Sequence, residues 1–114
     1  MRLTFVHLAV FLADWKRLKL GDEDLRALEL LVLEEPQAGR IIPGAAGLRK
    51  IRFSPPRWRR GKSGAIRVCY AFFARSSVVC FVVAYAKNEQ ENITAKLKAE
   101  YRQLLRGIEL EFGR

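Results

Sequence analysis

The chain has 114 residues, half of them hydrophobic, which suits a single domain over 1–114 with one modest core and leaves no room for a second. It carries 21 lysines and arginines against 12 acidic residues, and a formal net charge of +9 is typical of a protein that binds a polyanion such as nucleic acid. No apolar run is long enough to span a bilayer, and the run at 8–13 is too short for a signal peptide, so we expect a cytoplasmic protein.

The sequence begins with a predicted strand and a predicted helical hairpin. Alternation of apolar and polar residues over 2–7 is typical of a short strand. Apolar residues then recur with helical spacing from Leu8 to Leu18, and Gly21 ends this helix. Asp22 is a suitable N-cap for a second helix that ends near Pro36. The tight glycine turn between the helices predicts that they pack antiparallel.

A basic segment follows, and it holds the whole excess of positive charge. No acidic residue occurs between Glu35 and Glu89, whereas eleven lysines and arginines do, so this window has a local charge of +11. Repulsion among so many like charges destabilises a protein surface unless a polyanion neutralises it. We therefore interpret the segment as a phosphate-binding surface, although small basic proteins that bind anions nonspecifically have a similar composition.

Strands separated by turns are predicted within this segment. The stretch RIIPGAAG at 40–47 is expected to be a loop, because its proline and glycines favour turns. GLRKIRF predicts a strand over 47–53, on which Lys50 and Arg52 share one face. Two apolar runs at 66–73 and 78–85 predict a hairpin, and the second is apolar enough to be a central strand covered on both faces.

The last predicted element is a helix capped by Thr94, with apolar residues at helical spacing from Leu97 to Ile108. The complete order is βααβββα, an α+β domain with a mainly antiparallel sheet, an N-terminal helical hairpin and a C-terminal helix. Arg67 shares a strand face with the small residues Cys69 and Ala71, which leave space above them. An arginine near a strand end is just as often exposed to solvent, so both interpretations stay open.

The loop between the strand predicted at 47–53 and the strand predicted at 66–73 places Trp58 among arginines and a lysine. An aromatic ring beside cations can stack a base while the cations hold phosphates, and a tryptophan that packs the loop against the domain is an equal alternative. The GKS within this loop resembles the end of a P-loop, but the pattern requires glycine where Pro56 stands. Nucleotide hydrolysis is excluded on that ground.

Other catalytic chemistries find few candidate residues. The two cysteines, Cys69 and Cys80, lie in apolar strands, where a buried reduced thiol is expected, and His7 has no partner in its sequence context. No metal site and no cofactor are expected, since the basic window holds no carboxylate. Lysines and arginines alone can serve phosphodiester transfer, because charge accumulates on the phosphoryl and leaving oxygens. A lysine crowded by cations has a lowered pKa and can accept a proton, and on RNA the nucleophile would be the substrate's 2′-hydroxyl.

Three sequence blocks, GLRKIRF, GKSGAIRVCY and YAKNE, precede the terminal helix in the same order as in a known family. They resemble the RelE/HigB toxins of bacterial type II toxin–antitoxin modules, and the HigB branch more closely, over about 34–105. The resemblance implies a RelE-like fold and a ribosome-dependent endoribonuclease that cuts messenger RNA in the decoding site. It also implies an antitoxin partner, expected to be a helix-turn-helix DNA-binding protein from the same operon, and no membrane.

The resemblance also implies roles for individual residues. Lys50 and Arg52 match an alternating basic pair, of which one acts as base and both hold phosphate. Arg67 matches the arginine that stabilises the transition state, and Lys87 matches a basic residue after the last strand. A further family arginine falls at Asn88. The family's tyrosine falls near Ile93 or Thr94, so base stacking would pass to Tyr70, Tyr85 or Trp58. The expected surface for RNA and ribosome comprises Arg49, Arg57, Trp58, Arg59, Arg60, Lys62, Tyr70 and Asn88.

Two alternative functions stay open at this point. A ParE-type toxin shares the fold and binds DNA gyrase, but it does not need Lys50, Arg52 and Arg67 to converge. A non-catalytic RNA-binding domain needs only the basic window. Cleavage of RNA during translation separates both from the nuclease.

Overall fold

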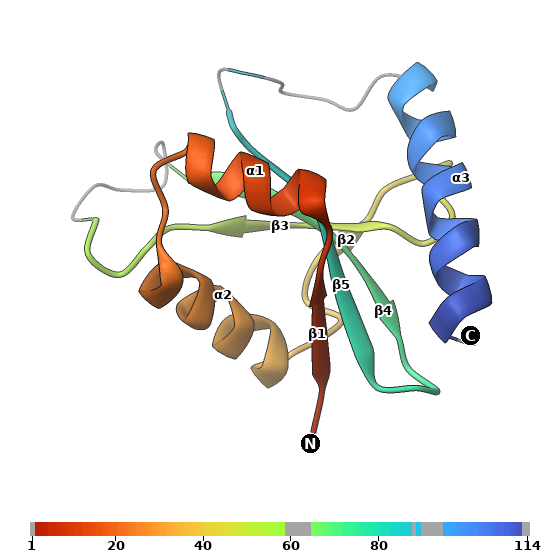
Figure 1. Ribbon diagram of the computed structural model, residues 1–114, viewed down its shortest axis with the longest axis horizontal. Helices are drawn as coiled ribbons and strands as arrows, with labels where there is room; N and C mark the ends of the chain where they lie inside the picture. Colours follow the sequence, from red (N-terminus) through yellow and green to blue (C-terminus); the bar gives the residue numbers. More distant parts are fainter. Residues whose placement is uncertain (1, 59–64, 88, 90–94, 113–114) are drawn as a thin grey trace.

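The structure is a computed structural model that describes residues 2–58, 65–87, 89 and 95–112 (Figure 1). Its elements are β1 (Thr4–His7), α1 (Ala9–Arg17), α2 (Asp22–Glu34), β2 (Arg40–Ile41), β3 (Arg49–Phe53), β4 (Ile66–Phe73), β5 (Val78–Ala86) and α3 (Ala95–Phe112). The five strands form one sheet in the order β1-β5-β4-β3-β2. The predicted α+β class is confirmed. None of the helices in the described part of the chain has the length and apolar character needed to cross a membrane.

The sheet is mainly antiparallel, as predicted. β4 pairs antiparallel with both β3 and β5, and β2 pairs antiparallel with β3. β1 is the exception, because it lies parallel to β5 on the other side of that strand. β5 is therefore paired along both edges over part of its length, and its residues up to Tyr85 are buried, which confirms the predicted central strand.

One predicted loop proved wrong in part. The first two residues of the stretch 40–47 form β2, with Arg40 opposite Lys50 and Ile41 opposite Arg49, so the order is βααββββα. The chain reverses through Gly44 and Gly47, whose positive φ angles of 76° and 88° suit glycine. A strand of two residues is too short to leave a periodic pattern in the sequence.

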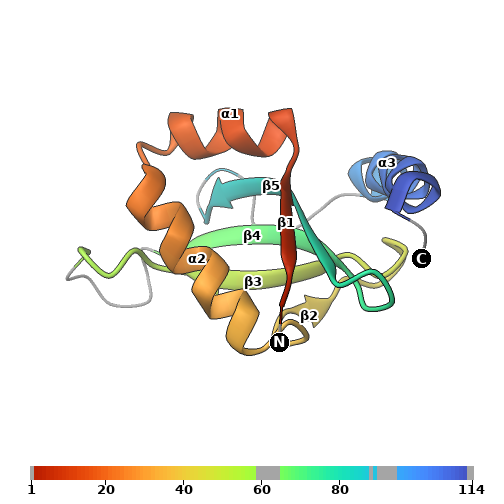
Figure 2. The same ribbon diagram turned by 60° about the horizontal axis from the view of Figure 1, so that its bottom comes forward.

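The sheet separates two apolar cores. Figures 1 and 2 show α1 and α2 on one side of the sheet and α3 on the other. The first core joins Phe11 and Leu28 of the helical hairpin to Val68 and Phe81 of the sheet. The second core joins side chains from the opposite face of the sheet to α3, and its members include Leu48, Cys69, Ala71, Val82, Leu105 and Ile108.

A bulge in β5 changes which side chains face α3. Cys69 lies opposite Val83, whereas the next residue, Tyr70, lies opposite Phe81, so Val82 is the extra residue. Val82 and Val83 consequently both join the α3 core, and the alternation of β5 reverses beyond them. The reversal places Tyr85 on the α3 face of the sheet, directly across from Arg67.

Both cysteines lie in the α3 core as free thiols with no exposed surface, as expected from their apolar surroundings. Burial raises the pKa of Cys69 to about 12 and the pKa of Cys80 to about 11. The folded state therefore keeps both thiols protonated over a pH range in which the unfolded chain ionises them near pH 9.

This difference makes the fold sensitive to alkali. A thiol whose pKa is raised by folding stabilises the protein fully below the unfolded pKa, and that contribution is lost as the pH rises through the folded pKa. We expect the free energy of unfolding to fall between about pH 9 and about pH 11, and Cys80→Ala to reduce the slope. Urea unfolding at a series of pH values measures this free energy. If it falls equally steeply with pH in Cys80→Ala and in the unmodified protein, Cys80 does not cause the sensitivity to alkali, whatever the difference in stability between the two proteins at pH 7.

Candidate functional site

A cationic pocket of about 650 Å³ lies where β2, β3 and β4 meet the end of β5. Five of its seven lining residues carry positive charge, and none of the lining residues is acidic: the pocket is lined by Ala38, Arg40, Lys50, Ile51, Arg52, Arg67 and Lys87. Three neighbouring strands, β2, β3 and β4, and the residue that follows β5 thus contribute to one concavity. The four residues predicted to be catalytic, Lys50, Arg52, Arg67 and Lys87, are all among those that line it.

Strand register brings these cations together. β3 places Lys50 and Arg52 on the same face, two residues apart, because side chains alternate along a strand. Antiparallel pairing then sets Arg52 opposite Arg67 and Lys50 opposite Cys69, whose small side chain leaves room beneath the lysine. Lys87 directly follows the last residue of β5 and reaches the same pocket.

Arg67 is the buried cation of the site. It is 8% exposed, and its Nη1 donates to the backbone oxygen of Ala65 at 2.8 Å. The alternative that this arginine faces solvent is therefore wrong. No acidic side chain in the described ranges pairs with it, and a buried charge without a counter-charge is unfavourable until an anion binds.

Arg40 is a pocket residue that the sequence did not single out. Its charge was counted in the basic window, but the stretch around it was expected to be a loop. In the structure Arg40 lies in β2 opposite Lys50 and lines the pocket. One signal in the sequence could have indicated a hairpin: a Pro-Gly turn at 43–44 lies between the pair RI at 40–41 and the run RKI at 49–51.

Three residues expected to contact RNA make structural contacts away from the pocket lining. Arg49 donates from Nη1 to the backbone oxygens of Gln37 and Gly39 at 3.0 and 2.8 Å. Arg57 pairs with the buried carboxylate of Asp24 at 3.0 Å. Trp58 packs, half-buried, against the helical-hairpin core. Contact of these three with RNA stays a prediction.

The contact with Arg57 has an electrostatic consequence for Asp24. The hydrogen-bonded guanidinium holds the pKa of the Asp24 carboxyl below its usual value, although burial acts against this shift. The same carboxylate accepts the backbone N–H of Gly21 at 2.8 Å and so caps the start of α2. Arg57 therefore joins the segment after β3 to the start of the second helix.

The prediction that Tyr70 contacts RNA is wrong. Its side chain is fully buried on the helical-hairpin side of the sheet, where its hydroxyl donates to Pro36 O at 2.8 Å and accepts the N–H of Gly39 at 3.0 Å. A ring without exposed surface cannot stack on a base. Tyr70 instead fixes the connection from α2 to β2, and with it the position of Arg40.

Tyr85, the second candidate for stacking, is also buried, at 5% exposure. Its hydroxyl has no hydrogen-bond partner among the described residues, and burial raises its pKa to about 12. The remaining predicted residues Arg59, Arg60, Lys62, Asn88, Ile93 and Thr94 lie outside the residues that the structure describes.

The pocket lining includes no acidic, thiol or histidine side chain of the described ranges. No three of their His, Cys, Asp and Glu side chains are grouped so as to hold a metal ion. His7 is bonded to Glu29 at 2.7 Å and stacks on Phe81, with a ring separation of 5.8 Å, so it belongs to the helical-hairpin side. The chemistry that the pocket offers is that of cations arranged around an anion.

Anion binding to this pocket can be measured directly. We expect inorganic phosphate to raise the melting temperature, because an anion that binds only the folded protein stabilises it and relieves repulsion among the cations. Arg67→Ala and Arg52→Ala should each remove most of this rise, whereas Arg26→Ala, an exposed arginine of α2, should keep it. Without phosphate, Lys50→Ala should melt at an unchanged or higher temperature. An equal rise in Arg67→Ala and in the unmodified protein would refute the site.

The fold was compared with known proteins. No protein-family model matches the chain. A double mutant of the E. coli toxin RelE in its free state, with two arginines replaced by alanine, is similar to it with a TM-score of 0.54 and 22% identity, over 80% of this chain and 90% of that one. A chain of the intact E. coli RelBE toxin–antitoxin complex is similar with a TM-score of 0.53 and 22% identity, over 74% of this chain and 95% of that one. The chain therefore has the fold of the RelE toxin.

Proposed function

We propose that this chain is the toxin of a type II toxin–antitoxin module and acts as a ribosome-dependent endoribonuclease on translated messenger RNA. One observation carries the proposal: on a RelE fold, five cations line a single pocket, and the most buried of them has no acidic partner among the described residues. Such a pocket is suited to a phosphodiester whose charge grows during reaction. The three sequence blocks shared with the RelE/HigB toxins give the same assignment.

The proposed reaction uses the side chains that line the pocket. The 2′-hydroxyl of the substrate attacks the adjacent phosphorus, and the bond from phosphorus to the 5′-oxygen of the next nucleotide breaks. The products are a 2′,3′-cyclic phosphate and a 5′-hydroxyl end. Lys50 accepts the proton of the 2′-hydroxyl, and Lys87, at the end of β5, returns a proton to the leaving oxygen.

Arginines stabilise the charge in this scheme. Arg52 and Arg67 lie opposite each other on neighbouring strands, so their guanidinium groups can hold the two non-bridging oxygens of one phosphate. Arg67 contributes most, because it is buried and one of its donors is already fixed on the backbone of Ala65. A fixed donor costs little reorganisation in the transition state.

Arg40 extends the pocket toward a neighbouring phosphate. It lies opposite Lys50, whereas Arg52 and Arg67 form a second pair two residues further along β3, at a distance of about 7 Å. Arg40 can therefore hold a neighbouring phosphate of the same strand, while Arg52 and Arg67 hold the one that reacts. The RNA backbone would then cross the strands of the sheet at the mouth of the pocket.

The partner of the proposed toxin is an antitoxin, and a toxin–antitoxin complex among the structural neighbours supports this. We infer that it is a helix-turn-helix DNA-binding protein from the same operon, that ribosome and messenger RNA are the other partners, and that the chain acts in the cytoplasm. The acidic residues at 14–35 give the helical hairpin a different electrostatic character from the pocket. The two surfaces can therefore serve different partners.

Cleavage in translating cells tests the nuclease. After induction, primer extension on a reporter message should reveal new 5′ ends in the translated region, and none when the start codon is removed. We expect Arg67→Ala to reduce cleavage by about 10²- to 10³-fold, the usual loss for a fixed transition-state donor, and Arg26→Ala to cleave normally. Growth arrest with inhibited gyrase and intact messages would identify a ParE-type toxin. RNA that is bound but never cut would identify a non-catalytic domain.

Binding of the antitoxin can be tested separately. We expect it to bind at nanomolar affinity or better through contacts that do not require the pocket cations, because desolvating several cations is costly unless each is paired. The triple variant Lys50→Ala, Arg52→Ala, Arg67→Ala should then bind within about threefold of the unmodified protein at two salt concentrations. A loss of several kcal/mol would show that the antitoxin fills the pocket.

A further inference from the structure

The outer edge of β5 is covered by a strand over only part of its length. β1 pairs with β5 as far as His7 opposite Phe81, and the N–H of Leu8 still donates to Phe81 O at 3.1 Å. The chain then turns away into α1. From Val82 to Ala86, no strand of the described chain lies along this edge. Backbone groups that point outward there need other partners.

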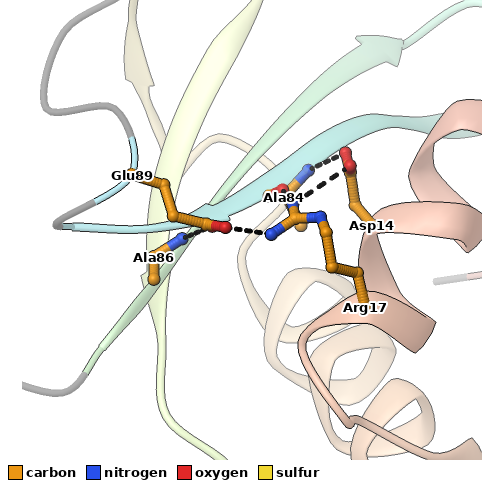
Figure 3. Close-up of polar contacts among 5 residues, drawn as sticks. All are labelled: Asp14, Arg17, Ala84, Ala86 and Glu89. Carbon is orange, nitrogen blue, oxygen red and sulfur yellow. Dashed lines mark hydrogen bonds and ion pairs between the residues drawn. The ribbon is translucent and has the colours of Figure 1, made fainter.

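Side chains supply these partners (Figure 3). Asp14 Oδ2 of α1 accepts the N–H of Ala84 at 3.0 Å, and Arg17 Nη2 donates to Ala84 O at 3.4 Å. Glu89 Oε1 accepts the N–H of Ala86 at 2.8 Å. Two carboxylates and one guanidinium thus take the place of a neighbouring strand. We call Asp14, Arg17 and Glu89 the Arg17 clasp.

Arg17 joins the two carboxylates of the clasp. Its Nη2 lies 3.2 Å from Asp14 Oδ1, and its Nη1 donates to Glu89 Oε2. Asp14 and Arg17 come from the first helix, whereas Glu89 follows the last strand. Figure 3 shows the guanidinium between the two carboxylates beside β5. The start of the chain is therefore bonded to the segment that leaves the sheet.

That segment carries Lys87. Glu89 and Ala86 close the turn around this lysine with two bonds, since the N–H of Glu89 donates to Ala86 O at 3.0 Å and the carboxylate accepts the N–H of Ala86. The same carboxylate is held by Arg17. Lys87 is exposed and lines the pocket, so its position depends on this turn.

We propose that Asp14, Arg17 and Glu89 are positioning residues that hold Lys87 at the pocket for the proposed cleavage reaction. This inference rests on the proposed function. Glu89 is the acidic residue of the YAKNE block, and the catalytic scheme gives it no role. The clasp gives it one, because it fixes the turn without contacting the substrate.

A positioning role predicts more loss of activity than of stability. The side chains of Arg17 and Glu89 are 45% and 38% exposed, and ion pairs of this kind contribute little to folding. A proton donor displaced by about 1 Å, in contrast, can cost up to about 10²-fold in rate. Arg17→Ala should therefore melt close to the unmodified protein yet cleave about tenfold more slowly.

A double-mutant cycle tests whether Arg17 acts through Lys87. Cleavage by the purified full chain on translating ribosomes is measured for Arg17→Ala, Lys87→Ala and the double variant. We expect Arg17→Ala to have no further effect once Lys87 is removed, and Glu89→Gln, which keeps the oxygen that accepts from Ala86, to lose less than Glu89→Ala. Lys16→Ala, the neighbouring exposed cation of α1, should behave like the unmodified protein. Additive losses, or an equal loss in Lys16→Ala, would overturn the proposal.

A second readout separates this inference from the proposed function. Binding is measured for the unmodified protein, Arg17→Ala, Lys87→Ala and the double variant. The ligands are inorganic phosphate and a 2′-O-methyl hexaribonucleotide, which cannot be cleaved, so these affinities do not depend on nuclease activity. If the unmodified protein binds these probes without cutting RNA, the proposed function fails. The clasp then stands when Arg17→Ala weakens binding only in the presence of Lys87. If the unmodified protein cleaves RNA but the effect of Arg17→Ala does not depend on Lys87 in either measurement, the positioning role of the Arg17 clasp is refuted and the proposed function stands.

Discussion

Packing of an apolar sheet holds five mutually repelling cations around one pocket, and the rest of the structure depends on this balance. Neighbouring strands lie about 4.8 Å apart, so register alone sets Arg52 beside Arg67. Two like charges at about 4 Å repel by about 1 kcal/mol in water and about 4 kcal/mol near a protein surface. Each large apolar side chain that the sheet buries contributes about 1.5–3 kcal/mol, and β4 and β5 bury many of them. The cores on both faces of the sheet therefore offset the repulsion among the pocket cations.

Two classes of cation result from this arrangement. On the helical-hairpin side, Arg17 and Arg57 are paired with carboxylates of α1 and α2. The pocket cations have no such partner in the described ranges. Asp14 and Asp24 both lie before the basic window, whereas Arg57 lies within it, so position in the sequence alone does not separate the structural cations from the pocket cations.

Much of this could be predicted from the sequence, because strands and helices of ordinary length leave periodic patterns. Alternation in β3 placed Lys50 and Arg52 on one face, whereas only the family resemblance joined Arg67 to them, because register between strands leaves no pattern in the sequence. These periodic patterns do not predict contacts between segments that are distant in the sequence. Nothing in a linear reading pairs Arg57 with Asp24, or Arg17 with Glu89 across 72 positions.

The errors have similar local causes. β2 has only two residues and was hidden by the turn that follows it. Tyr70 was taken for a surface aromatic, although the alternation that faces Arg67 toward α3 also faces Tyr70 into the opposite core. The bulge at Val82 has no sequence signature, and it alone decides that Tyr85 lies across from Arg67.

The parallel pairing of β1 with β5 has a consequence for the entropy of folding. β2 to β5 are consecutive along the chain and pair as hairpins or neighbours, so the pocket can form from one stretch by short-range closure. β1 must instead find β5 across most of the chain, with Thr4 opposite Val78, and loops of this length close at a greater entropic cost. Closing the sheet at β1 is therefore its most costly pairing in chain entropy, and the helical hairpin that follows β1 supplies one side of the first core. The sheet that carries the pocket cations is thus completed by the strand most distant from them in the sequence.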